Sequence, residues 1–140
     1  MKALTSKQIG IAVAVVCAFV LLIWIISKVK GKIEDSIVNN KLVDEVNAEM
    51  DVNQTTLTQS QLNTLSTKIY SALKGAGSDE DAVYSAFEEV QNRTDLLQLI
   101  KTFGVKDSLT IKEWLYDDLS VDEIAHINNI LATKNINYVF

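Results

Sequence analysis

The sequence predicts an all-α protein: an N-terminal single transmembrane helix, an amphipathic helical stalk and a small five-helix bundle. Three observations predict this class. Residues 9–26 are uninterruptedly apolar, residues 29–52 carry an apolar stripe with helical spacing, and helix-capping signals recur from residue 58 onward. The segments are therefore a short basic tail (1–8), a transmembrane helix (9–28), a stalk (29–52), a linker (53–57), a five-helix module (58–132) and a C-terminal tail (133–140).

The composition divides at residue 32 into two unlike parts. The whole chain has 140 residues, 48% of them hydrophobic, and a formal charge of -5. Residues 1–32 hold five lysines and no acid, whereas residues 33–140 hold eight basic and eighteen acidic side chains, which gives charges of +5 and -10. One cysteine and one histidine exclude a disulfide framework and Cys- or His-pair metal sites. The acidic module argues against a specific nucleic-acid partner.

The predicted membrane anchor is an eighteen-residue run, 9–26, without a charged side chain. As a helix it spans about 27 Å, close to the ~30 Å of a bilayer's hydrocarbon core, so the bilayer is the first expected partner. A cleavable signal peptide fits less well, because the run ends without a small-residue cleavage site. Lysines on both sides leave the topology open. The residues that define the anchor are Ile9, Gly10, Ala14, Ala18, Trp24, Ile26 and Lys28.

Within the anchor, Gly10, Ala14 and Ala18 recur every four residues. Such a stripe allows a second transmembrane helix to approach closely, although it is also ordinary composition for a span. In the stalk, apolar residues follow mostly at spacings of four: Ile33, Ile37, Val38, Leu42, Val46 and Met50. We expect this apolar stripe to pack against the module, against a second copy of the chain or against a partner protein.

The module begins with two helices that carry explicit end signals. Thr58 or Ser60 starts the first, and Gly75 is expected to provide its left-handed end. Ser78 is expected to cap the second, whose first turn is acidic and suits the positive end of the helix dipole. The core side chains of these two helices are Leu62, Leu65, Ile69, Leu73, Val83, Phe87 and Val90, with Tyr70 on the first helix and Tyr84 at the edge of the second.

Three further helices follow. Thr94 is expected to cap the third, which stops at Gly104; Thr110 begins the fourth; and Ser120 with Glu123 forms a capping box for the fifth. Only the tail, residues 136–140, shows the alternation of a strand. The predicted core residues of these helices are Leu96, Leu97, Leu99, Ile100, Phe103, Trp114, Leu115, Leu119, Ile124, Ile127, Ile130 and Leu131.

Residues 69–81, Ile-Tyr-Ser-Ala-Leu-Lys-Gly-Ala-Gly-Ser-Asp-Glu-Asp, resemble the annexin repeat, whose first interhelical loop has the form Lys-Gly-x-Gly-Thr-Asp-Glu. The resemblance covers about residues 57–131, includes the Phe-Gly pair at 103–104, and implies a bundle of five short helices. It departs from the family in that annexins are soluble and stack four repeats, and Ser78 stands where threonine is usual. Single repeats of this kind resemble proteins of Bacteroidetes-type bacteria and their phages.

The resemblance implies a calcium site. In annexins, carbonyl oxygens of the glycine loop and a downstream carboxylate hold calcium against phospholipid headgroups. Here these positions match Gly75, Gly77 and Asp118, with Asp117 as its neighbour. Calcium prefers such oxygen ligands. The alternative is a tight turn between helices, with both aspartates on a solvated face.

No catalytic constellation stands out in the sequence. His126 lacks a neighbouring nucleophile motif, and no phosphate-binding loop or dinucleotide fingerprint is present. We therefore expect no enzyme and no obligatory cofactor.

The sequence instead indicates a structural or interaction protein of a membrane. Its expected setting is a virion membrane or a bacterial envelope, for example a phage virion with an internal lipid layer. The expected partners are other membrane, capsid or envelope proteins, including further copies of the chain. Two alternatives are calcium-dependent binding of phospholipid or another ligand, and an accessory subunit of an envelope transport or secretion complex.

Overall fold

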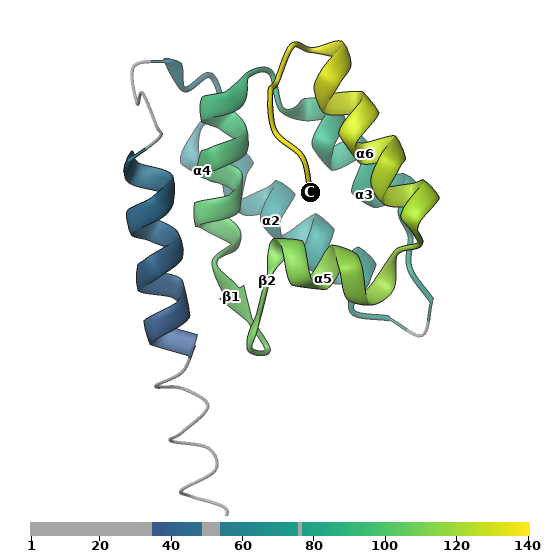
Figure 1. Ribbon diagram of the computed structural model, residues 1–140, viewed down its shortest axis with the longest axis horizontal. Coiled ribbons are helices and arrows are strands. Elements are labelled where there is room, and N and C mark those ends of the chain that lie inside the picture. Colours follow the sequence, from purple (N-terminus) through teal and green to yellow (C-terminus); the bar gives the residue numbers. More distant parts are fainter. Residues whose placement is uncertain (1–34, 49–53, 76) are drawn as a thin grey trace, which may run out of the picture. The chain divides into compact units, whose positions relative to one another are not determined.

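The computed structural model describes residues 35–48, 54–75 and 77–140. In these ranges the chain is mostly helical, as predicted (Figure 1). The predicted membrane helix and the basic tail before it lie outside the described residues. Within them, no helix is long and apolar enough to cross a bilayer. The helices are residues 35–48, α2 (Gln59–Leu73), α3 (Glu80–Glu89), α4 (Arg93–Phe103), α5 (Ile111–Asp118) and α6 (Val121–Thr133).

The five helices of the module surround one core, with α2 at its centre. α2 contacts α3, α4 and α5, while α6 contacts α3 and α5. All predicted aliphatic core positions of the module are buried, as is Phe87, whereas Tyr70, Tyr84 and Trp114 lie at the edge of the core. The apolar spacing of each helix therefore predicted its buried face correctly.

Three of the five helix starts follow the capping signals in the sequence. Thr58, Thr110 and Ser120 each accept a hydrogen bond from the amide three residues later, and the side chain of that later residue accepts one in return. The partners in these capping boxes are Gln61, Glu113 and Glu123. Each box satisfies amides that the first helical turn leaves unpaired.

The other two predicted caps are wrong. α3 is capped by Asp79, which accepts from the amide of Ala82, while Ser78 Oγ donates to Glu80 at 2.9 Å. α4 is capped by Asn92, because the predicted cap Thr94 lies inside the helix and is 5% exposed. In both places two residues near the helix start offer a capping oxygen, and at α4 the burial of Thr94 leaves Asn92 as the cap.

The left-handed turn predicted at Gly75 lies at Gly77 instead. α2 ends at Lys74 with φ -84° and ψ 34°, so the chain leaves the helix without a positive φ at the next residue. Gly77 has φ 114°, a conformation that a side chain disfavours. The prediction that α4 stops at Gly104 holds, since this glycine is the C-cap residue of the helix.

Residues 105–110 form a two-stranded hairpin that the sequence did not predict. β1 (Val105–Lys106) pairs antiparallel with β2 (Leu109–Thr110). The two turn residues, Asp107 and Ser108, have φ 49° and 70°, the left-handed conformation typical of tight hairpins. The strand suggested by alternation at residues 136–140 is absent, because the tail is held by side chains of α4 and α6 and not by another strand.

The helix at residues 35–48 confirms the described part of the predicted stalk. Val46 is buried, Leu42 is partly buried, and Asn47 Oδ1 accepts a hydrogen bond from Lys101 of α4 at 2.8 Å. Ile37 and Val38 remain exposed. Within residues 35–48, the module therefore covers Val46 and part of Leu42 and leaves Ile37 and Val38 exposed.

The capping boxes make the stability of the module depend on pH. Hydrogen bonds from the backbone and hydroxyl of Thr110 lower the pKa of Glu113, and those from the hydroxyl and backbone of Ser120 lower the pKa of Glu123. A lowered pKa means that the folded state binds fewer protons than the unfolded state. This stabilisation is full above the unfolded value of about 4.3 and is lost as the pH falls through the folded values.

We therefore expect the midpoint of urea unfolding to fall as the pH drops from about 6 to about 3. The fall should be smaller in a Glu113→Gln, Glu123→Gln variant, because glutamine keeps the capping geometry, as Gln61 does in α2. Trp114 fluorescence reports the transition if Trp24→Phe removes the second tryptophan. Identical pH profiles for the two proteins would contradict the expectation.

Candidate functional site

The predicted calcium residues lie in two connections of the module. Gly75 and Gly77 belong to the α2–α3 connection, and Asp117 and Asp118 form the end of α5. A Cβ on Gly75 would lie 3.0 Å from the Gly77 carbonyl oxygen, so the connection folds tightly on itself. Residue 76, between the two glycines, is outside the described residues.

Asp117 and Asp118 differ in their surroundings. Asp117 is exposed, whereas the Oδ2 atom of the half-buried Asp118 is buried and accepts no hydrogen bond. A buried carboxylate oxygen without a partner is costly unless a cation or proton approaches it. No group of three or more acidic, histidine or cysteine side chains in the described ranges is arranged to hold a metal. The calcium site therefore stays a prediction, with Asp118 as the residue that favours it.

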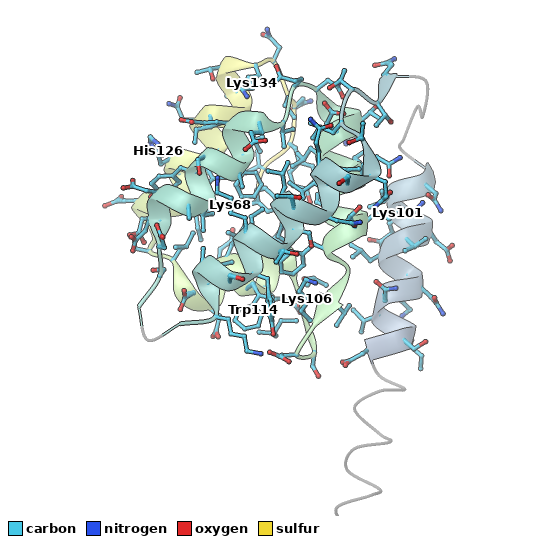
Figure 2. All side chains as sticks on the ribbon, turned by 180° about the vertical axis from the view of Figure 1, so that it is seen from behind. Lys68, Lys101, Lys106, Trp114, His126 and Lys134 are labelled. Carbon is cyan, nitrogen blue, oxygen red and sulfur yellow. The ribbon has the colours of Figure 1, made fainter. Side chains whose placement is uncertain are left out.

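A cation–aromatic cluster, which sequence reasoning missed, attaches the hairpin to α2. Asp107 Oδ2 accepts from Tyr70 Oη at 2.7 Å and pairs with Lys74 Nζ at 2.8 Å. Hydrogen bonds from Lys74 to Asp107 and to Tyr70 raise the pKa of Lys74, and the bonds from Lys74 and Tyr70 lower the pKa of Asp107. Lys106 Nζ lies 5.2 Å from the Tyr70 ring, and Trp114 Nε1 donates to the Lys106 carbonyl oxygen at 2.9 Å (Figure 2). The charges are paired within the fold, which indicates a structural role.

His126 lies on the exposed surface of α6. Its ring packs edge-on against Tyr84, with centroids 4.5 Å apart. Burial, together with the carboxylates of Glu123 and Glu80, raises the pKa of Tyr84. The pair is therefore a packing contact between two rings.

The three most exposed large apolar side chains of the described residues lie in α5, at the start of α6 and in the tail. Val121 is 81% exposed, Val139 of the tail 70% and Tyr116 of α5 55%, which is unusual for large apolar side chains in a well-packed module. Two hollows lie between them. We call this surface the α6 groove and define it by Tyr116, Val121, Ala125, Asn128, Ala132 and Val139.

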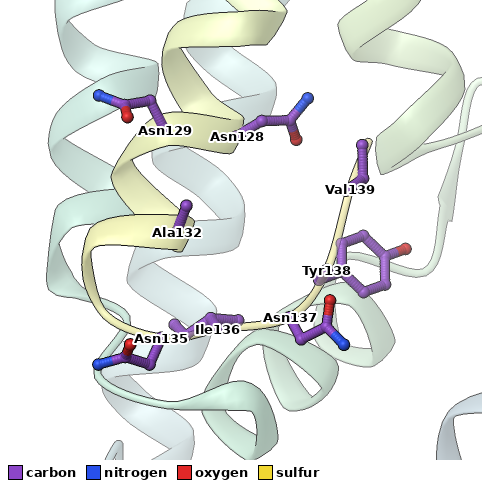
Figure 3. Close-up of a pocket in the computed structure, with 8 residues that line it drawn as sticks. All are labelled: Asn128, Asn129, Ala132, Asn135, Ile136, Asn137, Tyr138 and Val139. Atoms are coloured by element: carbon purple, nitrogen blue, oxygen red, sulfur yellow. The ribbon is translucent and has the colours of Figure 1, made fainter.

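The larger hollow of the α6 groove, about 580 Å³, lies between α6 and the tail (Figure 3). Its wall on α6 carries amides, including those of Asn128 and Asn129, and the small side chain of Ala132. A smaller hollow of about 190 Å³ lies between Tyr116, Val121 and Asn128. Asn128 lines both hollows, and its side chain is hydrogen-bonded there to the backbone of Phe140.

The tail forms one side of the groove because three contacts fix it. Arg93 donates to the carbonyl oxygen of Asn137, and the Phe140 amide donates to Asn128 Oδ1 at 2.9 Å. The side chains of Ile136 and Phe140 are buried in the core, which turns Val139 outward. The groove is therefore a fixed feature of the fold.

The charge along the groove is uneven. Asp117 and Asp122, the sequence neighbours of Tyr116 and Val121, are exposed, and Lys112 Nζ lies 5.9 Å from the centre of the Tyr116 ring. The other end carries neutral amides. Lys134, near that end, donates to the carbonyl oxygens of Glu88 in α3 and of Val90, the residue that follows α3.

No protein-family model, curated protein or solved structure matches this chain.

Proposed function

We propose that the protein is a non-enzymatic, single-pass membrane protein that serves as a structural or interaction component of a larger assembly. The observation that carries this proposal is the α6 groove, an exposed apolar surface on a module whose core is otherwise closed. The apolar run at residues 9–26 supports the membrane location. A virion with an internal lipid layer, or a bacterial envelope, is the setting we propose.

The membrane location has a direct test. We expect the full chain to float with phosphatidylcholine vesicles in a density gradient and to stay with them in alkaline carbonate. A variant with Val15→Glu, Val16→Lys and Phe19→Glu should stay at the bottom of the gradient, because charges in the middle of a span oppose insertion by about 3 kcal/mol each. Flotation of this variant to the same extent as the parent chain would contradict the proposed anchor.

The second candidate is calcium-dependent phospholipid binding, favoured by the unpartnered Oδ2 atom of Asp118. The charged variant separates the two functions, because its own anchor is disabled. If the candidate is right, the variant floats with phosphatidylserine vesicles in calcium but not in a chelator, and Asp118→Asn abolishes this. Asp117→Asn is the matched control at the exposed neighbour. Equal behaviour with and without calcium removes the candidate.

A further inference from the structure

We propose that the helix at residues 35–48, here called the strap, detaches from the module while the module stays folded, and that its release sets how far the module reaches from the membrane. In the structure the strap is docked, with Val46 buried and Asn47 bonded to Lys101 of α4. Three features carry the proposal: how little the strap buries, how loosely its contact is packed, and where the core of the module lies.

The strap buries little of its own surface. Val46 is the one buried side chain among residues 35–48, and Leu42 is partly buried. α2, a helix of similar length, buries six side chains. The hydrogen bond that Lys101 Nζ donates to Asn47 Oδ1 lies at the exposed surface, where water competes for both groups and the net gain is small. The strap is therefore held mainly by two apolar side chains.

The contact of the strap is also loosely packed. A hollow of about 110 Å³ is lined jointly by the strap, α4 and the tail. Its lining residues are Leu42, Glu45, Val46, Leu97, Ile100 and Tyr138. Well-packed interiors leave few voids larger than a water molecule, and side chains that line a void lose dispersion contacts on that side. The hollow therefore weakens the contact that Leu42 and Val46 make.

The module keeps a core of its own without the strap. Val46 is the one residue that the strap contributes to the core cluster, whose other members lie between Leu62 and Phe140. Segments with few buried apolar contacts open at a lower free-energy cost than core helices do. A free helix of fourteen residues is marginal in water, so a released strap also loses the protection of its amides.

Release of the strap lengthens the tether of the module. This consequence rests on the proposed function, which places an anchor at residues 9–28. With the strap docked, residues 29–34 connect the anchor to the module, whereas residues 29–58 do so after release. At up to about 3.5 Å per residue, the longest reach rises from about 20 Å to about 100 Å. An anchored component can then contact partners at different distances from the membrane with an unchanged module.

Two matched double variants test the release. Leu42→Asn with Val46→Asn removes the apolar contact of the strap. Ile37→Asn with Val38→Asn is the control, because these side chains of the same helix are 54% and 41% exposed. Asparagine is uncharged, so neither pair adds a charge that would interact with the helix dipole. Amide hydrogen exchange of the full chain in detergent micelles, followed by mass spectrometry, measures the protection of each helix.

In the parent chain we expect the amides of the strap to exchange at least tenfold faster than those of α2. The release variant should speed exchange of the strap at least tenfold further and leave α2 and α6 within twofold, while the control should change the strap less than threefold. Equal protection of the strap and α2 in the parent chain, or equal acceleration of both in the release variant, would overturn the proposal. So would equal acceleration of the strap in the two variants.

The reach is measured separately in phosphatidylcholine nanodiscs. A donor dye at Ser108→Cys, in a Cys17→Ala background, transfers energy to an acceptor on the lipid headgroups. We expect transfer to be about twofold lower in the release variant than in the control, because the longer tether lets the hairpin move away from the bilayer. Equal transfer would overturn the proposed change in reach. Because the exchange measurement needs no bilayer, a strap that fails to detach is distinguishable from an anchor that fails to insert.

Discussion

Replacing Asp95 by alanine is expected to lower the free energy of unfolding of the module by about 3 kcal/mol. Asp95 has no exposed surface, yet its carboxylate accepts four hydrogen bonds. Thr56 donates through its amide at 2.8 Å and its hydroxyl at 2.5 Å, and the amides of Leu57 and Gln91 donate at 3.2 and 3.3 Å. With alanine at this position, these donors would lose their acceptor in a site that is largely closed to water.

The control for Asp95 is Asp81, an exposed carboxylate in the first turn of α3. Both substitutions remove an acid from a helix N-terminus, so the dipole contribution cancels in the comparison. Asp81→Ala should therefore cost less than about 1 kcal/mol. Urea unfolding followed by Trp114 fluorescence in the Trp24→Phe background measures both. Equal costs for the two would show that the four hydrogen bonds contribute little.

Replacing Phe140 by alanine is expected to cost about 3–5 kcal/mol, the usual range for a buried phenylalanine. Phe140 is 3% exposed, and its ring contacts Phe87 edge-on with centroids 5.3 Å apart and Tyr138 at 5.0 Å. Alanine would leave a cavity against Phe87 in the core and release the segment that forms one side of the α6 groove.

Val139→Ala is the matched control for Phe140→Ala, because Val139 is the neighbouring residue and is 70% exposed. It should change the free energy of unfolding by less than about 0.5 kcal/mol. The same unfolding measurement applies. If Phe140→Ala were as mild as Val139→Ala, the tail would not be part of the core in solution.

The sequence predicted the fold well where the signal is local. The capping boxes at Thr58, Thr110 and Ser120 are complete within four residues, so the sequence alone identifies them. Thr94 and Asn92 compete for one helix start, and only the burial of Thr94 in the folded module decides between them. The hairpin was missed because its turn is Asp-Ser, without the glycine that usually marks such turns.

The candidate groove was less predictable. Helical spacing assigned Ile124 and Ile127 to the core. The exposed apolar side chains beside α6 do not repeat at helical spacing, so the sequence pattern does not reveal them. Val121 lies in the first turn of α6 and outside the spacing of the core residues. It was the one local indication of an exposed apolar surface. The side formed by Val139 depends on the burial of Phe140 against Phe87, a contact between distant residues that no pattern within the tail reveals.

The bonds to Asp95 also set an order of events during synthesis. Thr56 and Asp95 are 39 residues apart, and the Asn92 amide group donates to the Gln54 carbonyl oxygen across a similar interval. The ribosome makes the chain from its N-terminus. Residues 54–57 are therefore synthesised well before the residues of α4 and its cap to which they bond. Their donors must bond to water until α4 has been made, and loop closure then fixes them. The N-terminal boundary of the module is thus completed only when its third helix is in place.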